Sequence, residues 1–334
     1  MTIEIKPLLN TLRLQKIDDS EYFSKRYSGY ISNSRLSLIN PQQDGTPEKF
    51  FEGFKPMYSS SFAIGSFTHE LILQGELFEL VETVDKPTAK LGALADRLYS
   101  KSLSDQDIIN EAKIIDYYGG NLNDKKLQNV REKCVPYFEA RRQFESTYSG
   151  DKQLIYSDPK TRETVLNCVR ALKNNTQIQN LLHPTGVLNE PFSENEQAIL
   201  LDLEVTTTEC DPFILSFKAK LDNYTIDQVT NTITVNDVKT IGKIVSEIDN
   251  NIQKFRYNRE LAIYSWLLSL CASKYYSLDN PTVKANYLVV STIPQYYTKV
   301  VPITKAMFKE GWEEFKYLIK LVAYYYARGY RFKN

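Results

Sequence analysis

Histidine is scarce in this sequence of 334 residues, which contains only His69 and His183. A hydrolase of the Ser-His-Asp or Cys-His type would have to use one of these two, and no G-x-S-x-G segment accompanies them. The glycine-rich patterns G-x-x-x-x-G-K-[ST] and G-x-G-x-x-G are also missing. Serine-hydrolase chemistry and nucleotide-driven chemistry therefore have no support in the sequence.

Cysteine is equally rare, since the sequence has 4 cysteines, widely separated and without a C-x-x-C pair. This spacing argues against zinc ribbons and redox motifs and favours reduced, buried thiols. No run of 18 or more apolar residues occurs, so we expect no transmembrane helix and no membrane partner. The N-terminal residues lack a signal-peptide pattern, and we expect a cytoplasmic protein.

An excess of charge of either sign is missing as well, because Lys+Arg and Asp+Glu number 41 each. Any surface for nucleic acid must then be a local patch rather than a property of the whole chain. The hydrophobic fraction of 42% and the charged fraction of 25% are ordinary for a globular protein. The length allows one large domain or two modest ones.

The most informative stretch begins with an alternating pattern. Phe213, Leu215, Phe217, Ala219 and Leu221 are separated by more polar neighbours, which is typical of a half-buried strand.

Two acids and a lysine stand at the ends of this run and the next. Asp222 follows the first run, and after a turn at 227–231 the run 232–238 leads to Asp237 and Lys239. About fifteen residues separate the two acids, the length of two short strands and a turn, so they can meet in space. Lys239 points to the same face as Asp237 because strand side chains alternate.

Such a trio suits one kind of chemistry. Two neighbouring carboxylates repel each other, and a hard divalent cation with oxygen ligands neutralises them most simply. The lysine can then hold an attacking water or a phosphate oxygen. The pattern predicts metal-assisted hydrolysis of a phosphodiester.

This arrangement resembles the PD-(D/E)xK nuclease superfamily. Asp222 matches the isolated acid, and Asp237-Val238-Lys239 matches the acid-x-lysine element. In the following helix, Glu260 and Tyr264 stand where the RecB-like branch carries Gln-x-x-x-Tyr. The glutamate departs from that pattern and adds a negative charge near the site.

A second stretch strengthens the resemblance. In SSSFAIGSFTHELILQGELF, at 59–78, Gly65 and His69 form G-x-x-x-H before an apolar run. Taken alone, His69 is a packed helical histidine. Together with ISNSRLSLIN at 31–40, however, the segment is similar to the RecE-like (exonuclease VIII) and lambda-exonuclease-type phage recombination exonucleases.

The resemblance implies an α/β fold, with a restriction-endonuclease-like core whose central mixed β-sheet is flanked by helices. It also implies a Mg²⁺ or Mn²⁺ site held by His69, Asp222, Asp237 and the Val238 carbonyl, with Lys239 orienting or activating water. Glu260 and Tyr264 are then catalytic residues that shape the site and touch the DNA backbone.

The activity that follows from the resemblance is a metal-dependent DNA exonuclease that resects duplex ends for recombination. The implied partners are DNA, copies of the chain in a ring-type trimer or tetramer, and a single-strand annealing protein. A phage-encoded chain would act in the host cytoplasm. Two alternatives stay open: a structure-specific or restriction-type endonuclease of the same superfamily, and an inactive DNA-binding or assembly protein, which Glu260 favours.

Basic residues near these motifs are candidate phosphate contacts. Lys218 and Lys220 alternate toward the face opposite the apolar residues, and Arg256 and Arg259 lie on the polar side of a helix expected over 243–270. Solvated edge charges explain the two lysines equally well. Glu196, just before a strand expected over 198–206, and Glu204, near the end of that strand, are lesser candidates for an extra metal carboxylate.

The rest of the chain is assigned by pattern. We expect an N-terminal helical part over 1–83, opening with a short amphipathic segment, a helical insertion over 84–185 and the nuclease core over 186–334. Basic residues within 125–142 are read as a solvated helix face, with a DNA-guiding face as the alternative. Two further strands are expected over 286–292 and 296–303, and a last helix over 305–327. The aromatic tail at 324–334 is expected to pack rather than to stack on bases.

Overall fold

The structure is a computed structural model that describes residues 3–53, 59–83, 85–184, 191–208 and 210–332. Its centre is a six-stranded mixed sheet with the strand order β1-β4-β5-β6-β7-β8. Only β6 and β7 are parallel, and all other neighbours are antiparallel. The strands are β1 (Ile3–Lys16), β4 (Phe192–Thr207), β5 (Phe213–Asp227), β6 (Thr232–Ile241), β7 (Thr282–Ser291) and β8 (Thr298–Pro302).

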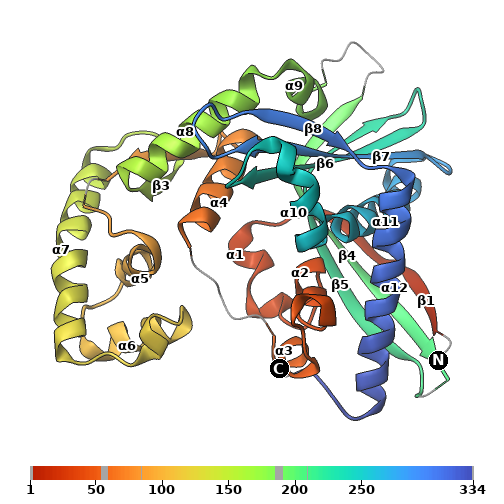
Figure 1. Ribbon diagram of the computed structural model, residues 1–334, viewed down its shortest axis with the longest axis horizontal. Coiled ribbons are helices and arrows are strands. Elements are labelled where there is room, and N and C mark those ends of the chain that lie inside the picture. Colours follow the sequence, from red (N-terminus) through yellow and green to blue (C-terminus); the bar gives the residue numbers. More distant parts are fainter. Residues whose placement is uncertain (1–2, 54–58, 84, 185–190, 209, 333–334) are drawn as a thin grey trace.

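Two long helices cover one face of this sheet (Figure 1). α11 (Tyr257–Tyr276) and α12 (Lys305–Ala327) bury Leu267 and Phe315 against the alternating apolar residues of β5, such as Phe217. The parallel pair β6–β7 requires a crossover, which α11 and the shorter α10 (Ile248–Phe255) supply. The helices approach closely because Gly311 has no side chain, and an alanine Cβ there would overlap the Asn258 carbonyl.

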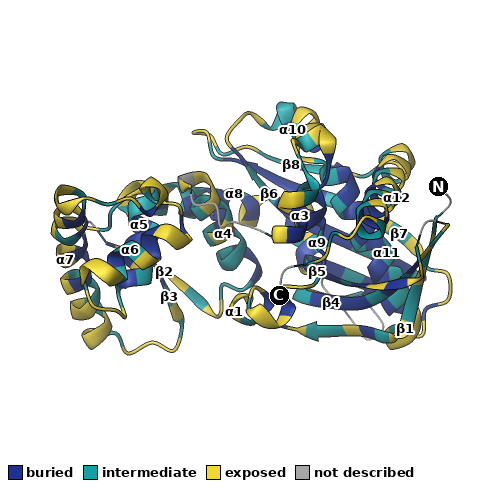
Figure 2. Ribbon diagram, turned by 90° about the horizontal axis from the view of Figure 1, so that it is seen from below, coloured by how far each residue is buried: buried dark blue, intermediate teal, exposed yellow. Residues whose placement is uncertain are grey.

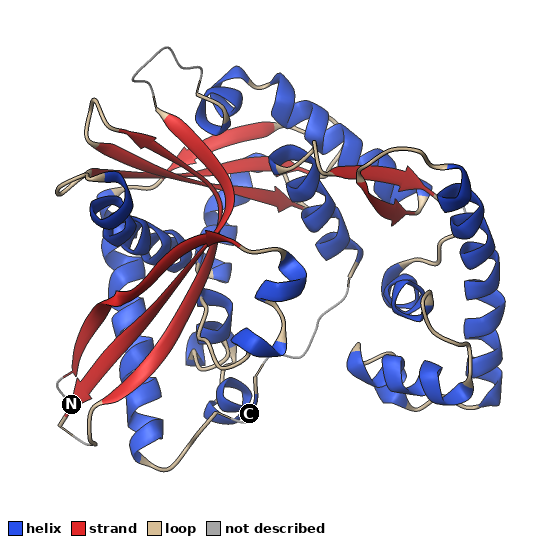
Figure 3. Ribbon diagram, turned by 180° about the vertical axis from the view of Figure 1, so that it is seen from behind, coloured by secondary structure: helices blue, strands red, loops and turns tan. Residues whose placement is uncertain are grey.

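The opposite face is covered in two parts. α4 (Ser60–Leu73), α8 (Pro159–Asn174) and α9 (Thr176–Leu182) pack Ile72 and Leu172 against Val238 and Leu288 of β6 and β7. α1 (Asp19–Tyr22) and the 3₁₀ turn η1 (Lys25–Tyr27) pack against β4. Figure 3 shows the strands between helices on both sides. The predicted α/β class, with a central mixed sheet flanked by helices, is confirmed.

Residues from Val81 to Tyr156 enclose a hydrophobic cluster of their own beside the sheet (Figure 2). The lobe contains α5 (Ala89–Leu98), α6 (Asp105–Ile114), the 3₁₀ turn η3 (Tyr118–Gly120) and α7 (Asp124–Thr147). Its two-stranded parallel sheet, β2 (Phe78–Glu82) with β3 (Gln153–Ser157), was not expected. The segment predicted as one insertion, 84–185, thus packs in two parts, since α8 and α9 pack against the central sheet and not within the lobe. The domain boundaries stay a prediction.

Short helices and the C-terminal residues complete the fold. α2 (Asn33–Ser37), whose first turn is capped by the side chain of Ser32, is followed by the 3₁₀ turn η2 (Pro41–Gln43) and α3 (Pro47–Glu52). The C-terminal end lies beside α3, where the ring of Phe332 is 5.1 Å from that of Phe51 (Figure 1). The expectation that the aromatic tail packs is confirmed at this residue. No helix in the described ranges is long and apolar enough to span a membrane.

Three local predictions are wrong. The part expected to be helical over 1–83 opens instead with the edge strand β1, whose alternation is obscured by a register shift between Leu8 and Arg13. The helix expected over 243–270 is broken at Arg256, whose φ of 56° separates α10 from α11. Asp222 does not end its strand, because β5 continues to Asp227.

Candidate active site

The candidate site lies where β5 and β6 separate. The last paired residues of the two strands are Asn223 and Asn236. Asp222, the next residue along β5 toward its start, turns its carboxylate into the fork and accepts a hydrogen bond of 2.8 Å from the Val238 amide. The side chain thereby satisfies a backbone donor that the ladder no longer pairs. The isolated acid Asp222 and the Asp237-Val238-Lys239 element are therefore neighbours in the structure, as their sequence positions predicted.

A kink in β4 brings a third strand to the same place. Asn195 pairs with Asn223 and Gln197 with Leu221, so Glu196 lies across from Asp222 in the register. Glu196 has a φ of 55°, an uncommon value for a residue other than glycine. Such strained backbone is often found at functional sites. Glu196 was a lesser candidate in the sequence, because a strand-flanking acid gives no signal of a backbone turn.

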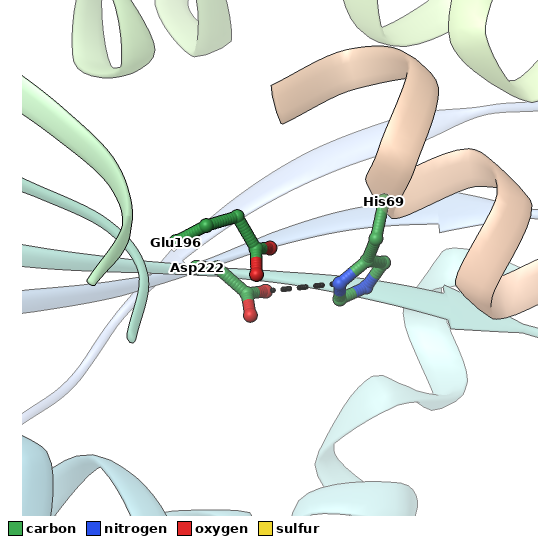
Figure 4. A group of neighbouring side chains, drawn as sticks. All are labelled: His69, Glu196 and Asp222. Atoms are coloured by element: carbon green, nitrogen blue, oxygen red, sulfur yellow. Dashed lines mark ion pairs between the residues drawn. The ribbon is translucent and has the colours of Figure 1, made fainter. Parts of the chain in front are cut away.

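His69 reaches the two acids from α4, on the other side of the fork (Figure 4). Its Nδ1 is 3.3 Å from Oδ2 of Asp222, and one ligand atom from each of His69, Glu196 and Asp222 lies within 4.8 Å of the others. One turn earlier, Gly65 lets α4 lie close to β6, since a Cβ would stand 3.2 Å from the Thr240 hydroxyl.

These three side chains fit a divalent cation. Burial, aided by the positive charge of Lys239, lowers the pKa of His69, so the imidazole is neutral and able to bind a metal. Burial and the neighbouring Glu196 raise the pKa of Asp222 to about 7. A crowded, desolvated carboxylate of this kind gains from a cation, and one imidazole with two carboxylates suits Mg²⁺ or Mn²⁺.

Lys239 occupies the centre of a second group of side chains. Its Nζ is 2.9 Å from Oδ2 of Asp237 and 2.9 Å from Oε2 of Glu260, and it lies over the ring of Tyr257. The hydroxyl of Tyr264 donates to Oε1 of Glu260 at 3.3 Å. The four predicted residues on β6 and α11 therefore touch one another.

The charges of this second group decide what Lys239 can do. Burial opposes its ammonium form, yet Asp237 and Glu260 together raise its pKa well above the usual value. Lys239 is therefore a permanent cation that can hold an anion or orient a water, and it cannot take up a proton. Asp237, in contrast, can take up a proton, because burial raises its pKa to about 8 despite the nearby lysine.

The two groups meet at Val238. Its amide donates to Asp222, and its backbone also forms a hydrogen bond with His69, which offsets only a small part of the lowering of the His69 pKa. Asp237 and Lys239 flank it in the sequence. The structure thus places all the predicted metal ligands in one region but groups His69 and Asp222 with Glu196, while Asp237 contacts Lys239. Metal binding by Asp237 and the Val238 carbonyl stays a prediction.

Two of the predicted phosphate contacts are wrong because the side chains are buried. Arg259 is fully buried, and its guanidinium donates to Asn33 Oδ1 and Ser37 Oγ, each at 2.7 Å, and to Glu314 at 3.1 Å. Lys218 is 8% exposed and donates to the carbonyl of Tyr22 at 2.7 Å. Both cations therefore connect elements of the fold and do not face solvent.

The other two basic candidates have different positions. Lys220 lies inside the site, where it contacts Asp19 and stands 2.7 Å from Glu196. Arg256 is partly exposed, contacts Gln42 and lies 3.7 Å from Glu314. Their binding of DNA stays a prediction. Glu204 is outside the site, since it pairs with Lys6 of β1 at 3.7 Å.

The chain was also compared with known proteins. It matches no protein-family model and no curated protein. Among solved structures, it is similar to a protein from Eubacterium rectale that is named provisionally as an exonuclease, with a TM-score of 0.42 and 8% sequence identity. That likeness covers 90% of this chain and 82% of the other. A likeness this weak says nothing about the chemistry of the site.

Proposed function

We propose that this chain is a divalent-metal-dependent deoxyribonuclease that hydrolyses phosphodiester bonds. The observation that carries the proposal is the convergence of His69, Glu196 and Asp222 within 4.8 Å, beside a lysine held by two acids.

His69, Glu196 and Asp222 would hold the metal, which when bound stabilises negative charge on the phosphate and makes a bound water more acidic. Lys239 stands one residue beyond Val238, on the same strand, and its charge would orient the attacking water or a non-bridging phosphate oxygen. Asp237, 2.9 Å from Lys239, would help to hold that lysine in place and, as the motif resemblance implies, would add a carboxylate ligand to the metal. Glu260 and Tyr264 fix the position of Lys239.

Within this activity we favour an exonuclease that acts from the ends of duplex DNA, as the motif resemblance implies. Assembly of several copies into a ring and cooperation with an annealing protein belong to the same proposal. Phosphate contacts without base readout would dominate binding to DNA. An endonuclease and an inactive DNA-binding protein remain the alternatives.

The test is cleavage of linear and covalently closed circular duplex DNA with Mg²⁺ or Mn²⁺. The proposal predicts degradation of linear DNA alone, abolished in Asp222→Asn and retained in Glu204→Gln, which neutralises an acid outside the site. Cutting of the closed circle would establish the endonuclease. Absence of cleavage by the wild-type protein with either metal, while DNA is still bound, would refute the proposed activity.

A further inference from the structure

Two aromatic rings connect the lysine of the candidate site with the protein surface. The Nζ of Lys239 lies 4.7 Å from the centre of the Tyr257 ring, and that ring is stacked on Phe255 with the ring centres 5.6 Å apart and the planes at 27°. Adding the two distances places the centre of the Phe255 ring no more than 10.3 Å from the lysine ammonium. Tyr257 is partly buried against the core, whereas Phe255 is 45% exposed, so the outer side of the pair is open to solvent.

A break between α10 and α11 brings these two rings together. In a continuous helix, residues i and i+2 point about 200° apart and do not face each other. Arg256, between the two aromatic residues, has a φ of 56°, a conformation that residues other than glycine seldom adopt and that is often kept at functional sites. Phe255 adds to none of the hydrophobic clusters among the described residues, so packing of the core does not account for the stacked pair.

A cation stands beside the exposed ring. Lys254 is exposed, and its Nζ lies 5.3 Å from the centre of the Phe255 ring. The acids of the elements around the ring are either paired with cations or distant: Glu247 with Lys243, Glu314 with Arg256 and Arg259, and Asp249 about 9 Å away along the axis of α10. An aromatic ring with a neighbouring ammonium group matches the base and the phosphate of a nucleotide.

We propose that Phe255 and Tyr257 form a stacking platform for an unpaired base of the DNA strand whose phosphate is bound at Lys239, with Lys254 against the phosphate of the stacked nucleotide. The inference rests on the proposed nuclease function and deepens it, because a base inside a duplex is already stacked on both faces and only an unpaired or terminal base offers one. Nucleotides of a stacked strand follow at about 3.4 Å, so the platform would hold a base about three nucleotides from Lys239. Stacking of this kind holds single strands without regard to their sequence.

The experiment compares two fluorescent oligomers of equal length by anisotropy, in EDTA and low salt, so that no metal and no cleavage are involved. One is an oligothymidylate, and the other consists of abasic nucleotides, which keep every phosphate and lack every base. The wild type should bind the oligothymidylate at least about fivefold more tightly. Phe255→Ala should lower this ratio of affinities at least about fivefold, whereas Phe255→Trp, which keeps an aromatic ring, should preserve it.

Two further variants separate the base contact from other effects. Tyr275→Ala removes a ring that is 42% exposed at the other end of α11, about 27 Å from Tyr257 along the axis, and should leave the ratio unchanged. Lys254→Gln should weaken the binding of both oligomers alike and reduce the slope of log affinity against log salt by about 0.7. Lys254, Phe255 and Tyr275 are all exposed, so these variants should fold.

An unchanged ratio in Phe255→Ala would overturn the inference, as would a wild-type protein that binds the two oligomers equally or binds neither. An unchanged ratio together with a smaller sedimentation coefficient of Phe255→Ala would show that the ring is a contact between copies of the chain instead. An unchanged salt slope in Lys254→Gln would refute the phosphate contact. Failure of the nuclease proposal looks different: the ratio would depend on Phe255, yet the wild type would cleave no DNA with Mg²⁺ or Mn²⁺.

Discussion

Arg259 is the residue for which the structure makes the sharpest quantitative prediction. The sequence places it among DNA contacts, but the structure buries its guanidinium against Asn33, Ser37 and Glu314. Replacing it by methionine keeps most of the packed volume and removes every one of these hydrogen bonds. The carboxylate of Glu314, 12% exposed, then loses its closest charge partner.

Removal of one partner from a buried ion pair costs about 3–5 kcal/mol, because the remaining charge stays buried. Such a loss is a large part of the 5–15 kcal/mol that typically stabilises a folded protein. We therefore expect Arg259→Met to lower the free energy of unfolding by about 3–5 kcal/mol in urea titrations, with an unchanged m-value.

Arg256→Met is the matched control. Arg256 lies 3.7 Å from the same Glu314 but is 22% exposed, so its loss should cost less than about 1 kcal/mol. A second comparison is Arg259→Met with Glu314→Gln, which also removes the carboxylate that Arg259 had paired and should recover part of the stability. If Arg259→Met changed stability by less than Arg256→Met and instead weakened DNA binding, the assignment of Arg259 to the fold would be refuted.

Two further predictions concern the same core. Burial, reinforced by Arg35, lowers the pKa of Lys218 from 10.5 to about 8. Between these two pH values the unfolded chain binds more protons than the folded one, so Lys218 adds stability as pH rises from about 8 to 10.5. In urea titrations across that range the free energy of unfolding of Lys218→Met should rise less than that of the wild type, and equal slopes would contradict the assignment. Gly311→Ala should lower the free energy of unfolding by about 1–3 kcal/mol in urea titrations, because the new Cβ overlaps the Asn258 carbonyl. Gly242→Ala, with open space around the Cβ, should change it by less than about 0.5 kcal/mol. Equal effects at the two glycines would contradict this and show that α11 and α12 can shift apart.

Features that depend on neighbouring residues were predictable from the sequence. The alternation from Phe213 to Leu221 identifies β5, and the helix expected over 305–327 is α12. Asp237 and Lys239 contact each other because the strand period fixes their face. His69 and Asp222, 153 positions apart, were brought together only by the motif resemblance, since no local pattern connects them.

Features that depend on distant partners were not predictable. Glu196 joins the site through a left-handed backbone conformation that its neighbours in the sequence do not indicate. Arg259 follows the polar side of its helix in the sequence, and only the packing of α2 and α12 over that side shows that it is buried. β1 was missed because an edge strand with a register shift loses the alternation on which recognition depends.

The central claim is that His69, Glu196 and Asp222 form a metal site, and direct binding of Mn²⁺ tests it without reference to cleavage. Isothermal titration should detect Mn²⁺ binding to the wild-type protein, at least about tenfold weaker in His69→Ala and unchanged in His183→Ala, which removes the other histidine of the chain. Equal affinity of His69→Ala and the wild type would contradict the account.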